Sequence, residues 1–178
     1  NRLDLSRIEG GALRPDRDWH DLSDLVQHVL EQMERQTERH RIDVKLPDDL
    51  PLVWLDYVQI SQVMTNVIGN AVKYTPPGST IEVAATPVEG DGLVELRVTD
   101  HGPGIPAAAL PHIFETFYRA LPDGHVPGAG VGLAICKGLV EAHGGTIAAE
   151  SRTREGTTMR GRLPVGPAEP ASDGRGAA

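Results

Sequence analysis

Residues 57–74 carry the most regular pattern in the chain and predict a long amphipathic helix. Its apolar residues recur at helical spacing and form one stripe, which consists of Ile60, Val63, Met64, Val67, Ile68, Ala71 and Val72. A polar stripe runs beside it at spacings of four, four and three residues, through Gln62, Asn66, Asn70 and Lys73. Asparagine is a mediocre helix former, so two of them one turn apart suggest a binding task. A solvated polar face explains this edge about equally well when the helix is taken alone.

The remaining patterns predict a mixture of helices and strands. Helices are expected over 22–33, 107–117 and 131–143, with the last turns of another at 3–9. Strands are expected over 41–46, 52–55, 80–86, 93–100, 146–150 and 157–163. Because strands and helices come in runs and do not strictly alternate, the order favours an α+β fold with a mixed sheet layered on helices.

The composition excludes several classes of protein. With 178 residues the chain can hold one sizeable core. Its net charge of -8 argues against a nucleic-acid or anionic-membrane binder, because such partners need a basic face. The single cysteine, Cys136, excludes an internal disulfide and a cysteine-rich zinc site, and its place within a predicted helix indicates a buried structural thiol.

Asp100 ends the strand over 93–100 on the same face as Val94, Leu96 and Val98, so its side chain is expected to point toward the core side. A carboxylate in that place needs a hydrogen-bond donor, and the exocyclic amine of adenine is one. Guanine presents an acceptor there and would be rejected. Gly102 and Gly104 then let the backbone approach a base closely. Alone, Asp-x-Gly-x-Gly is more often only a turn.

A second glycine-rich segment, Gly128-Ala-Gly130-Val-Gly132, leads into the helix predicted from residue 131. Free backbone N–H groups at a helix N-terminus bind phosphate favourably. A dinucleotide fingerprint is excluded because no strand directly precedes the glycines, and a P-loop is excluded because Gly-Lys-Ser/Thr does not occur. The Pro/Gly-rich segment 121–130 is a candidate mobile loop, and Phe114 and Phe117 before it could anchor its hinge or simply pack in the core.

The polar edge of the helix over 57–74 suits a metal-bound phosphate chain. An amide oxygen, as in Asn66 or Asn70, is a neutral hard ligand for a magnesium ion already held by phosphates. Lys73 adds a point charge for those phosphates. The sequence therefore predicts a pocket for an adenine nucleotide with magnesium.

In this order, the motifs resemble the ATP-binding catalytic domain of two-component sensor histidine kinases, part of the gyrase, Hsp90, histidine kinase and MutL superfamily. Residues 66–74 resemble its N box, 100–104 its G1 box, 114–117 its F box and 128–132 its G2 box. The resemblance covers residues 20–163. It implies a two-layer sandwich, with a mixed sheet of about five strands on three helices, and an ATP lid over 121–130.

The resemblance also implies a role for each matching residue. Asn70 would ligate magnesium, Asn66 and Lys73 would contact phosphate, Tyr74 would pack on the base and Asp100 would hold adenine. The other ATP-binding residues that it implies are Gly102, Gly104, Phe117, Arg119, Gly128, Gly130, Gly132, Leu133 and Thr157. The cofactors would be ATP and Mg²⁺.

The resemblance further divides the chain into three parts. Residues 1–18 are expected to be the end of a dimerisation helix and a linker, most similar to kinases of the potassium-responsive KdpD type. Residues 19–164 would form the catalytic domain and 165–178 a disordered tail. His20-Asp21-Leu22 mimics the start of a phosphoacceptor motif, but it lies after the dimerisation helix, so the acceptor histidine is expected outside this chain. The other histidines are expected to have no chemical role.

The implied partners are the protein's own dimerisation and histidine phosphotransfer domain and a response regulator, with no nucleic acid. This piece is expected to be a monomer from a homodimeric parent. The domain would be cytoplasmic, and membrane anchoring of the parent is left open.

Three functions remain open. The first is transfer of the γ-phosphoryl group to histidine. The second is ATP hydrolysis of the gyrase or Hsp90 type, which uses a glutamate where this chain has Asn66, four residues before Asn70. An amide cannot take a proton, so Asn66 favours transfer. The third is a non-catalytic nucleotide-sensing module. The family also carries aromatic and apolar residues where this chain has Gly156-Thr-Thr-Met159-Arg-Gly161, which predicts looser packing under the adenine.

Overall fold

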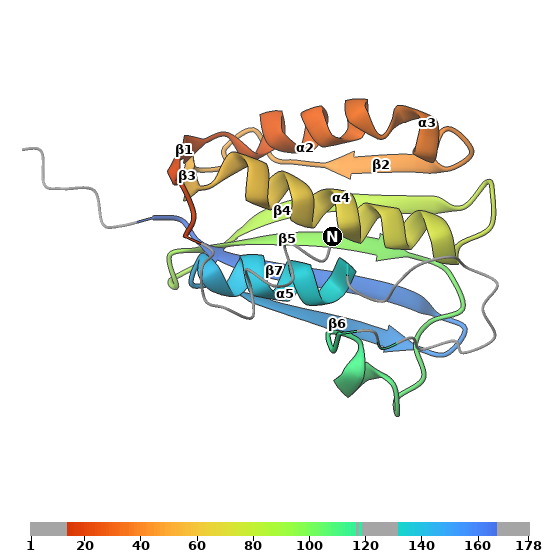
Figure 1. The fold of residues 1–178 in the computed structure, drawn as a ribbon. Coiled ribbons are helices and arrows are strands. Elements are labelled where there is room, and N and C mark those ends of the chain that lie inside the picture. The colour runs from red at the N-terminus through yellow and green to blue at the C-terminus, as the bar shows by residue number, and fades with distance from the viewer. Residues whose placement is uncertain (1–13, 117, 119–131, 167–178) are drawn as a thin grey trace, which may run out of the picture.

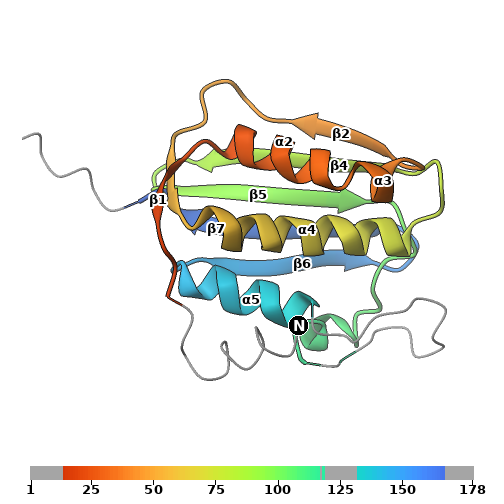
Figure 2. The same ribbon diagram turned by 45° about the horizontal axis from the view of Figure 1, so that its top comes forward.

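Helices cover one face of a twisted sheet in the computed structural model, which describes residues 14–116, 118 and 132–166 (Figures 1 and 2). The sheet has five strands in the order β2-β4-β5-β7-β6. Their bounds are Arg41–Lys45, Thr80–Val88, Leu93–Asp100, Gly156–Pro164 and Thr146–Arg152, respectively. β2 runs parallel to β4, whereas the other neighbours are antiparallel, so the sheet is mixed. The predicted α+β class is confirmed.

Three helices form the second layer: α2 (Leu22–Gln32), α4 (Tyr57–Tyr74) and α5 (Gly132–Ala142). A short helix, α3 (Glu34–Thr37), follows α2. The apolar stripe of α4 is buried against the sheet because its residues recur at helical spacing. Asp21 and Asp56 start α2 and α4 as side-chain caps, each accepting a hydrogen bond from a backbone N–H of the first turn. No helix within the described ranges is long and apolar enough to cross a membrane.

One predicted helix is wrong. Residues 107–117 were expected to be helical, but the structure has only a 3₁₀ turn, η1, at Leu110–His112 in the described part of this segment. Short-range bonds replace a helical ladder, such as those from the N–H of Ala109 to Pro106 O and from the N–H of His112 to Ala109 O. Pro111 has no N–H and disfavours the α conformation at Leu110, so a regular helix cannot run through it.

One strand was missed. β1 (Asp18–His20) pairs antiparallel with β3 (Val53–Leu55) as a separate two-stranded sheet at one end of the fold (Figure 1). The sequence Asp-Trp-His is too short and too polar to give a strand pattern. Trp19 and Trp54 face each other across this pair, with ring centroids 5.3 Å apart.

The face of the sheet that points away from the described helices carries a charge cluster around Glu95. This carboxylate lies 2.9 Å from Nε of Arg162, 3.3 Å from Nε of Arg160 and 3.4 Å from Nε of Arg97. Glu95 is only 7% exposed, because the three arginine side chains cover it. The ion pairs explain how a strand in the middle of the sheet can hold a nearly buried carboxylate.

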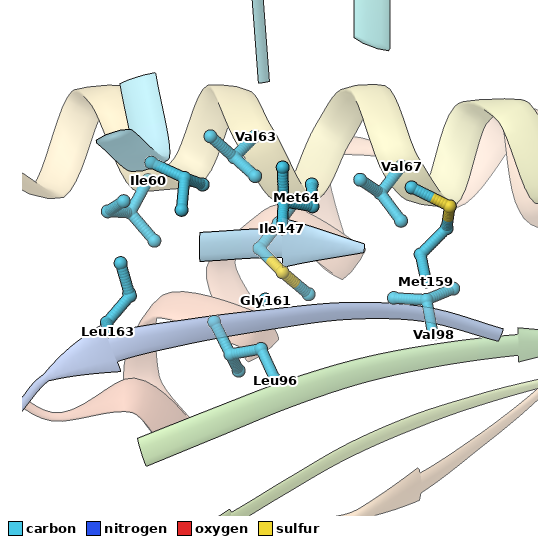
Figure 3. A pocket seen from close by; sticks show the side chains of 11 residues that line it. Ile60, Val63, Met64, Val67, Leu96, Val98, Ile147, Met159, Gly161 and Leu163 are labelled. Carbon is cyan, nitrogen blue, oxygen red and sulfur yellow. The ribbon is translucent and has the colours of Figure 1, made fainter. Parts of the chain in front are cut away.

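A small cavity lies between α4 and the strands β5, β6 and β7 (Figure 3). Its volume is about 20 Å³, and apolar residues line it, including Val67, Val98 and Met159. Gly161 also lines it, and a Cβ there would have no atom within 4 Å. Met159 and Gly161 thus border an interior void, while looser packing under the adenine stays a prediction. Since the lining offers a water almost no hydrogen bonds, the void is dry.

Candidate nucleotide-binding site

The polar residues of α4 run from the middle of the helix to its C-terminal end. Asn66 and Asn70 are half-buried, whereas Lys73 and Tyr74 are exposed in the last turn. The side-chain amide of Asn66 donates a hydrogen bond of 3.5 Å to the carbonyl oxygen of Gly132. Gly132 begins α5, so this contact places the start of α5 against the middle of α4. The predicted phosphate residues Asn66 and Gly132 are thus neighbours.

Gly102 brings the loop after β5 to the end of α4. A Cβ at this position would lie 2.8 Å from the carbonyl oxygen of Tyr74 and 3.0 Å from Cγ2 of Thr75. Any larger residue would push the loop and the helix apart. Gly104 has a φ of +75°, and a Cβ there would overlap the carbonyl oxygen of Arg152 at the end of β6. The two predicted glycines therefore fix the loop against separate elements.

Asp100 stands at the end of β5, half-buried beside the same loop. Its Oδ1 accepts a hydrogen bond of 3.0 Å from the N–H of Gly102. Burial raises the pKa of this carboxyl above its usual value, although the backbone N–H groups of Gly102 and Thr157 oppose the rise. The carboxylate is therefore less well solvated than in water, and a ligand that donates a hydrogen bond to it would relieve that cost.

Sequence reasoning missed two residues that hold this end together. Gly156 has a φ of +92°, and a Cβ there would overlap the carbonyl oxygen of Asp100. Its position after a short turn between two predicted strands could have revealed it. Ser151 Oγ accepts a 2.7 Å bond from the N–H of Ile105 and donates a 2.7 Å bond to the carbonyl oxygen of Gly156. Nothing in the sequence around Ser151 signals this role.

Thr157 and Leu133 also lie near this end. Thr157 pairs with Asp100 across β5 and β7, and its Oγ1 lies 2.9 Å from Ser151 Oγ. Leu133 is in the first turn of α5, whose first N–H groups have no partner within the helix. The other predicted residues, Phe117, Arg119, Gly128 and Gly130, and the segment 121–130 lie outside the described residues.

Two further sequence predictions concern side chains near the site. Cys136 on α5 is fully buried, and its Sγ lies 3.7 Å from the carbonyl oxygen of Val63, to which it donates. The prediction of a buried structural thiol is confirmed, and burial raises the pKa of this thiol to about 12. Phe114 is half-buried and packs against the core. In the described part of the chain, no group of three or more His, Cys, Asp or Glu side chains could hold a metal ion.

Comparisons with known proteins agree with this arrangement. Residues 55–167 match the family of histidine kinase-, DNA gyrase B- and HSP90-like ATPases. The sensor protein KdpD of Escherichia coli is 38% identical over 164 residues, which are 92% of this chain but only 18% of that protein. This chain thus spans about a fifth of the length of that relative.

Two solved structures share both fold and sequence. The mycobacterial sensor histidine kinase MprB superposes with a TM-score of 0.74 at 30% identity, over 85% of this chain and 99% of that one. Full-length ShkA in complex with AMPPNP superposes with a TM-score of 0.83 at 28% identity, over 94% of this chain and 35% of that one. The chain therefore belongs to the histidine kinase-, DNA gyrase B- and HSP90-like ATPase family, as an ATP-binding catalytic domain of the sensor histidine kinase type.

Proposed function

We propose that this domain binds Mg-ATP at the end of the fold where α4, the end of β5 and the start of α5 meet, and that it donates the γ-phosphoryl group to a histidine of a dimerisation domain. The convergence of these three segments carries the proposal. Gly102 holds the loop of Asp100 against Tyr74, and Gly132 lies against Asn66. Groups suited to a base and groups suited to phosphates are thus held on neighbouring segments.

The adenine base would lie against Asp100. Its exocyclic amine would donate a hydrogen bond to the carboxylate of Asp100, which also accepts one from the N–H of Gly102. Tyr74, which is 40% exposed at the end of α4, would pack on the base, with Gly102, Gly104 and Thr157 shaping the same end. AMPPNP, which is bound in the related ShkA structure, is an ATP analogue and contains this base.

The phosphates would run from the base toward the start of α5. Asn66, Lys73 and the N–H groups at Gly132 and Leu133 would contact them. The half-buried amide of Asn70, one helical turn from Asn66, fits a magnesium ion held mainly by phosphate oxygens. When bound, magnesium would neutralise charge on the phosphates. Phe117, Arg119, Gly128 and Gly130 are proposed to complete the site, with 121–130 as its lid.

Transfer is favoured over hydrolysis by the chemistry of Asn66. Its amide nitrogen already donates to the carbonyl oxygen of Gly132, and an amide cannot take a proton from water. Catalysis would then consist of positioning and charge neutralisation. The acceptor would be a histidine outside this chain, on the dimerisation domain of a homodimeric parent, and a response regulator would be the next acceptor. The catalytic domain itself would be a cytoplasmic monomer.

The test is phosphorylation in trans. The 178-residue chain would be mixed with a separately made dimerisation domain from a KdpD-type kinase and with radiolabelled Mg-ATP. We expect acid-labile, base-stable label on the added domain, as phosphohistidine requires. Asn70→Ala would abolish the magnesium-dependent labelling while leaving the fold intact, because it removes the proposed metal ligand and no buried packing group.

Other outcomes would overturn the proposal. Steady ATP hydrolysis by the chain alone that is lost on changing Asn66 would indicate an ATPase of the gyrase or Hsp90 type. Failure to bind ATP analogues at millimolar concentration would favour the third function, a non-catalytic module, over both enzymatic ones. Magnesium-dependent labelling that survives Asn70→Ala would refute the metal assignment.

A further inference from the structure

Asp56 and His143 meet at the end of the helical layer that is opposite the proposed nucleotide site. The backbone N–H of Asp56 donates a hydrogen bond of 3.1 Å to Nε2 of His143. Asp56 caps the start of α4, and His143 directly follows the end of α5. Both side chains are nearly buried, with exposed fractions of 9% and 4%. This pair therefore joins the N-cap residue of α4 to the residue that follows α5.

The contacts of the imidazole fix its protonation. Nδ1 lies 2.8 Å from the carbonyl oxygen of Leu139, which can only accept, so Nδ1 carries the proton. Nε2 must then offer its lone pair to the N–H of Asp56. The pair thus requires a neutral histidine in one tautomer, and a second proton on Nε2 would break the bond to Asp56.

The segment just before β1 is tied to the same pair. The N–H of Asp16 donates a 2.8 Å bond to Oδ2 of Asp56, and Nη2 of Arg17 donates a 2.8 Å bond to the carbonyl oxygen of Ala142 at the end of α5. A cation is favourable at a helix C-terminus. Consecutive residues of this segment therefore hold the start of α4 and the end of α5 together.

The residues proposed to contact the phosphates lie farther along the same two helices. α5 begins at Gly132, against Asn66 of α4. α5 has 11 residues, so it is about 16 Å long, and a tilt of about 5° at His143 would move Gly132 by about 1.4 Å. Displacements of about 1 Å in a site can cost about a hundredfold in rate. A contact far from the nucleotide can therefore control its phosphate end.

We propose that Asp56 and His143, with Asp16 and Arg17, form a positioning joint that sets the angle of α5 relative to α4 and thereby the grip on the phosphates of ATP. The proposal rests on the proposed function, because it assumes that Mg-ATP binds between these helices. Asp100 stands on β5 and Tyr74 on α4, so a tilt of α5 alone moves the groups at Gly132 and Leu133 and leaves both proposed base contacts in place.

The test compares ATP with adenosine, which lacks phosphates. His143→Leu removes the acceptor for the N–H of Asp56, whereas His143→Gln keeps an oxygen at the corresponding position. Arg17→Met removes the cap of α5 with little change in length, and Arg14→Met, at an exposed residue nearby, is its matched control. Mg-ATP affinity would be measured by calorimetry and adenosine affinity by NMR titration, well below the melting temperature of each variant.

We expect His143→Leu and Arg17→Met to weaken Mg-ATP binding by about tenfold relative to adenosine binding. In His143→Gln and Arg14→Met, the affinity for Mg-ATP relative to adenosine would stay close to that of the parent. Equal ATP affinity in all variants, or parallel losses of ATP and adenosine binding, would overturn the joint and leave the proposed function standing. A parent chain that does not bind Mg-ATP would overturn both.

Discussion

At the scale of single residues, the carboxylate of Asp100 is costly to bury and is proposed to bind adenine. It is half-buried, and burial raises its pKa, so the ligand-free domain has to hold a charge that is poorly solvated. The N–H groups of Gly102 and Thr157 compensate for this only in part. The sequence placed Asp100 on the correct face of β5, because alternation along a strand is a reliable rule. It could not reveal Ser151, which holds the loop after Asp100 through contacts between distant segments.

Asp100→Asn tests whether this residue reads the base. The amide would still accept from the N–H of Gly102, but its NH₂ group would oppose the amine of adenine. We expect ATP affinity to fall by about 10- to 100-fold, the worth of a hydrogen bond to a charged group, and the preference over GTP to narrow. The ligand-free variant would melt at a higher temperature, since the buried charge is gone. Unchanged nucleotide preference would show that Asp100 does not read the base.

At the scale of elements, the glycines of the chain fall into two groups that the sequence could not separate. Gly102 is required because the carbonyl oxygen of Tyr74 leaves no room for a Cβ, whereas Gly161 has open space beside it. Long elements such as α4 were predicted almost residue by residue because their apolar stripe is strong. The segment 107–117 was mispredicted because its apolar spacing resembled a helix, while Pro111 forbids one.

Gly102→Ala and Gly161→Ala make a matched pair of substitutions. Gly102→Ala would cost about 1–3 kcal/mol of stability through overpacking and would weaken ATP binding, because the loop moves off α4. Gly161→Ala would raise stability by about 1 kcal/mol, since it fills part of the cavity and reduces the freedom of the unfolded chain. Chemical denaturation and nucleotide titration of both variants would check this. If both substitutions changed the stability equally, the space around each glycine would not explain why Gly102 is required.

At the scale of the whole molecule, the fold was predictable from the order of its elements, whereas the site that four motifs indicate stays a prediction. The joint of Asp56 and His143 was not predictable, because its partners lie 87 positions apart and the histidines were expected to have no role. His143 is instead a buried neutral base whose two ring nitrogens are both used. Such a group couples the stability of the whole domain to pH.

Burial lowers the pKa of His143, and the charge of Arg17 lowers it further, although Leu139 O and the Asp56 carboxylate act in the opposite direction. The unfolded chain therefore binds this proton at higher pH than the folded chain does. The contribution of His143 to the unfolding free energy would be constant above about pH 7 and would fall as pH drops through 6.5, by at most about 1.4 kcal/mol per pH unit. Urea denaturation between pH 5 and 8 would show this slope for the parent and a smaller one for His143→Gln. Identical slopes would contradict it.

The place of β5 in the sheet has one more consequence. β5 lies between β4 and β7, so its backbone amides are covered on both sides and open only when the sheet itself comes apart. Asp100 is the last residue of this strand. The residues proposed to contact the phosphates lie on helices, which can shift without breaking the sheet. A bound nucleotide would consequently leave the site by releasing its triphosphate first. Substitutions in the helices would change the rate of nucleotide turnover more readily than they would change the nucleobase that is bound.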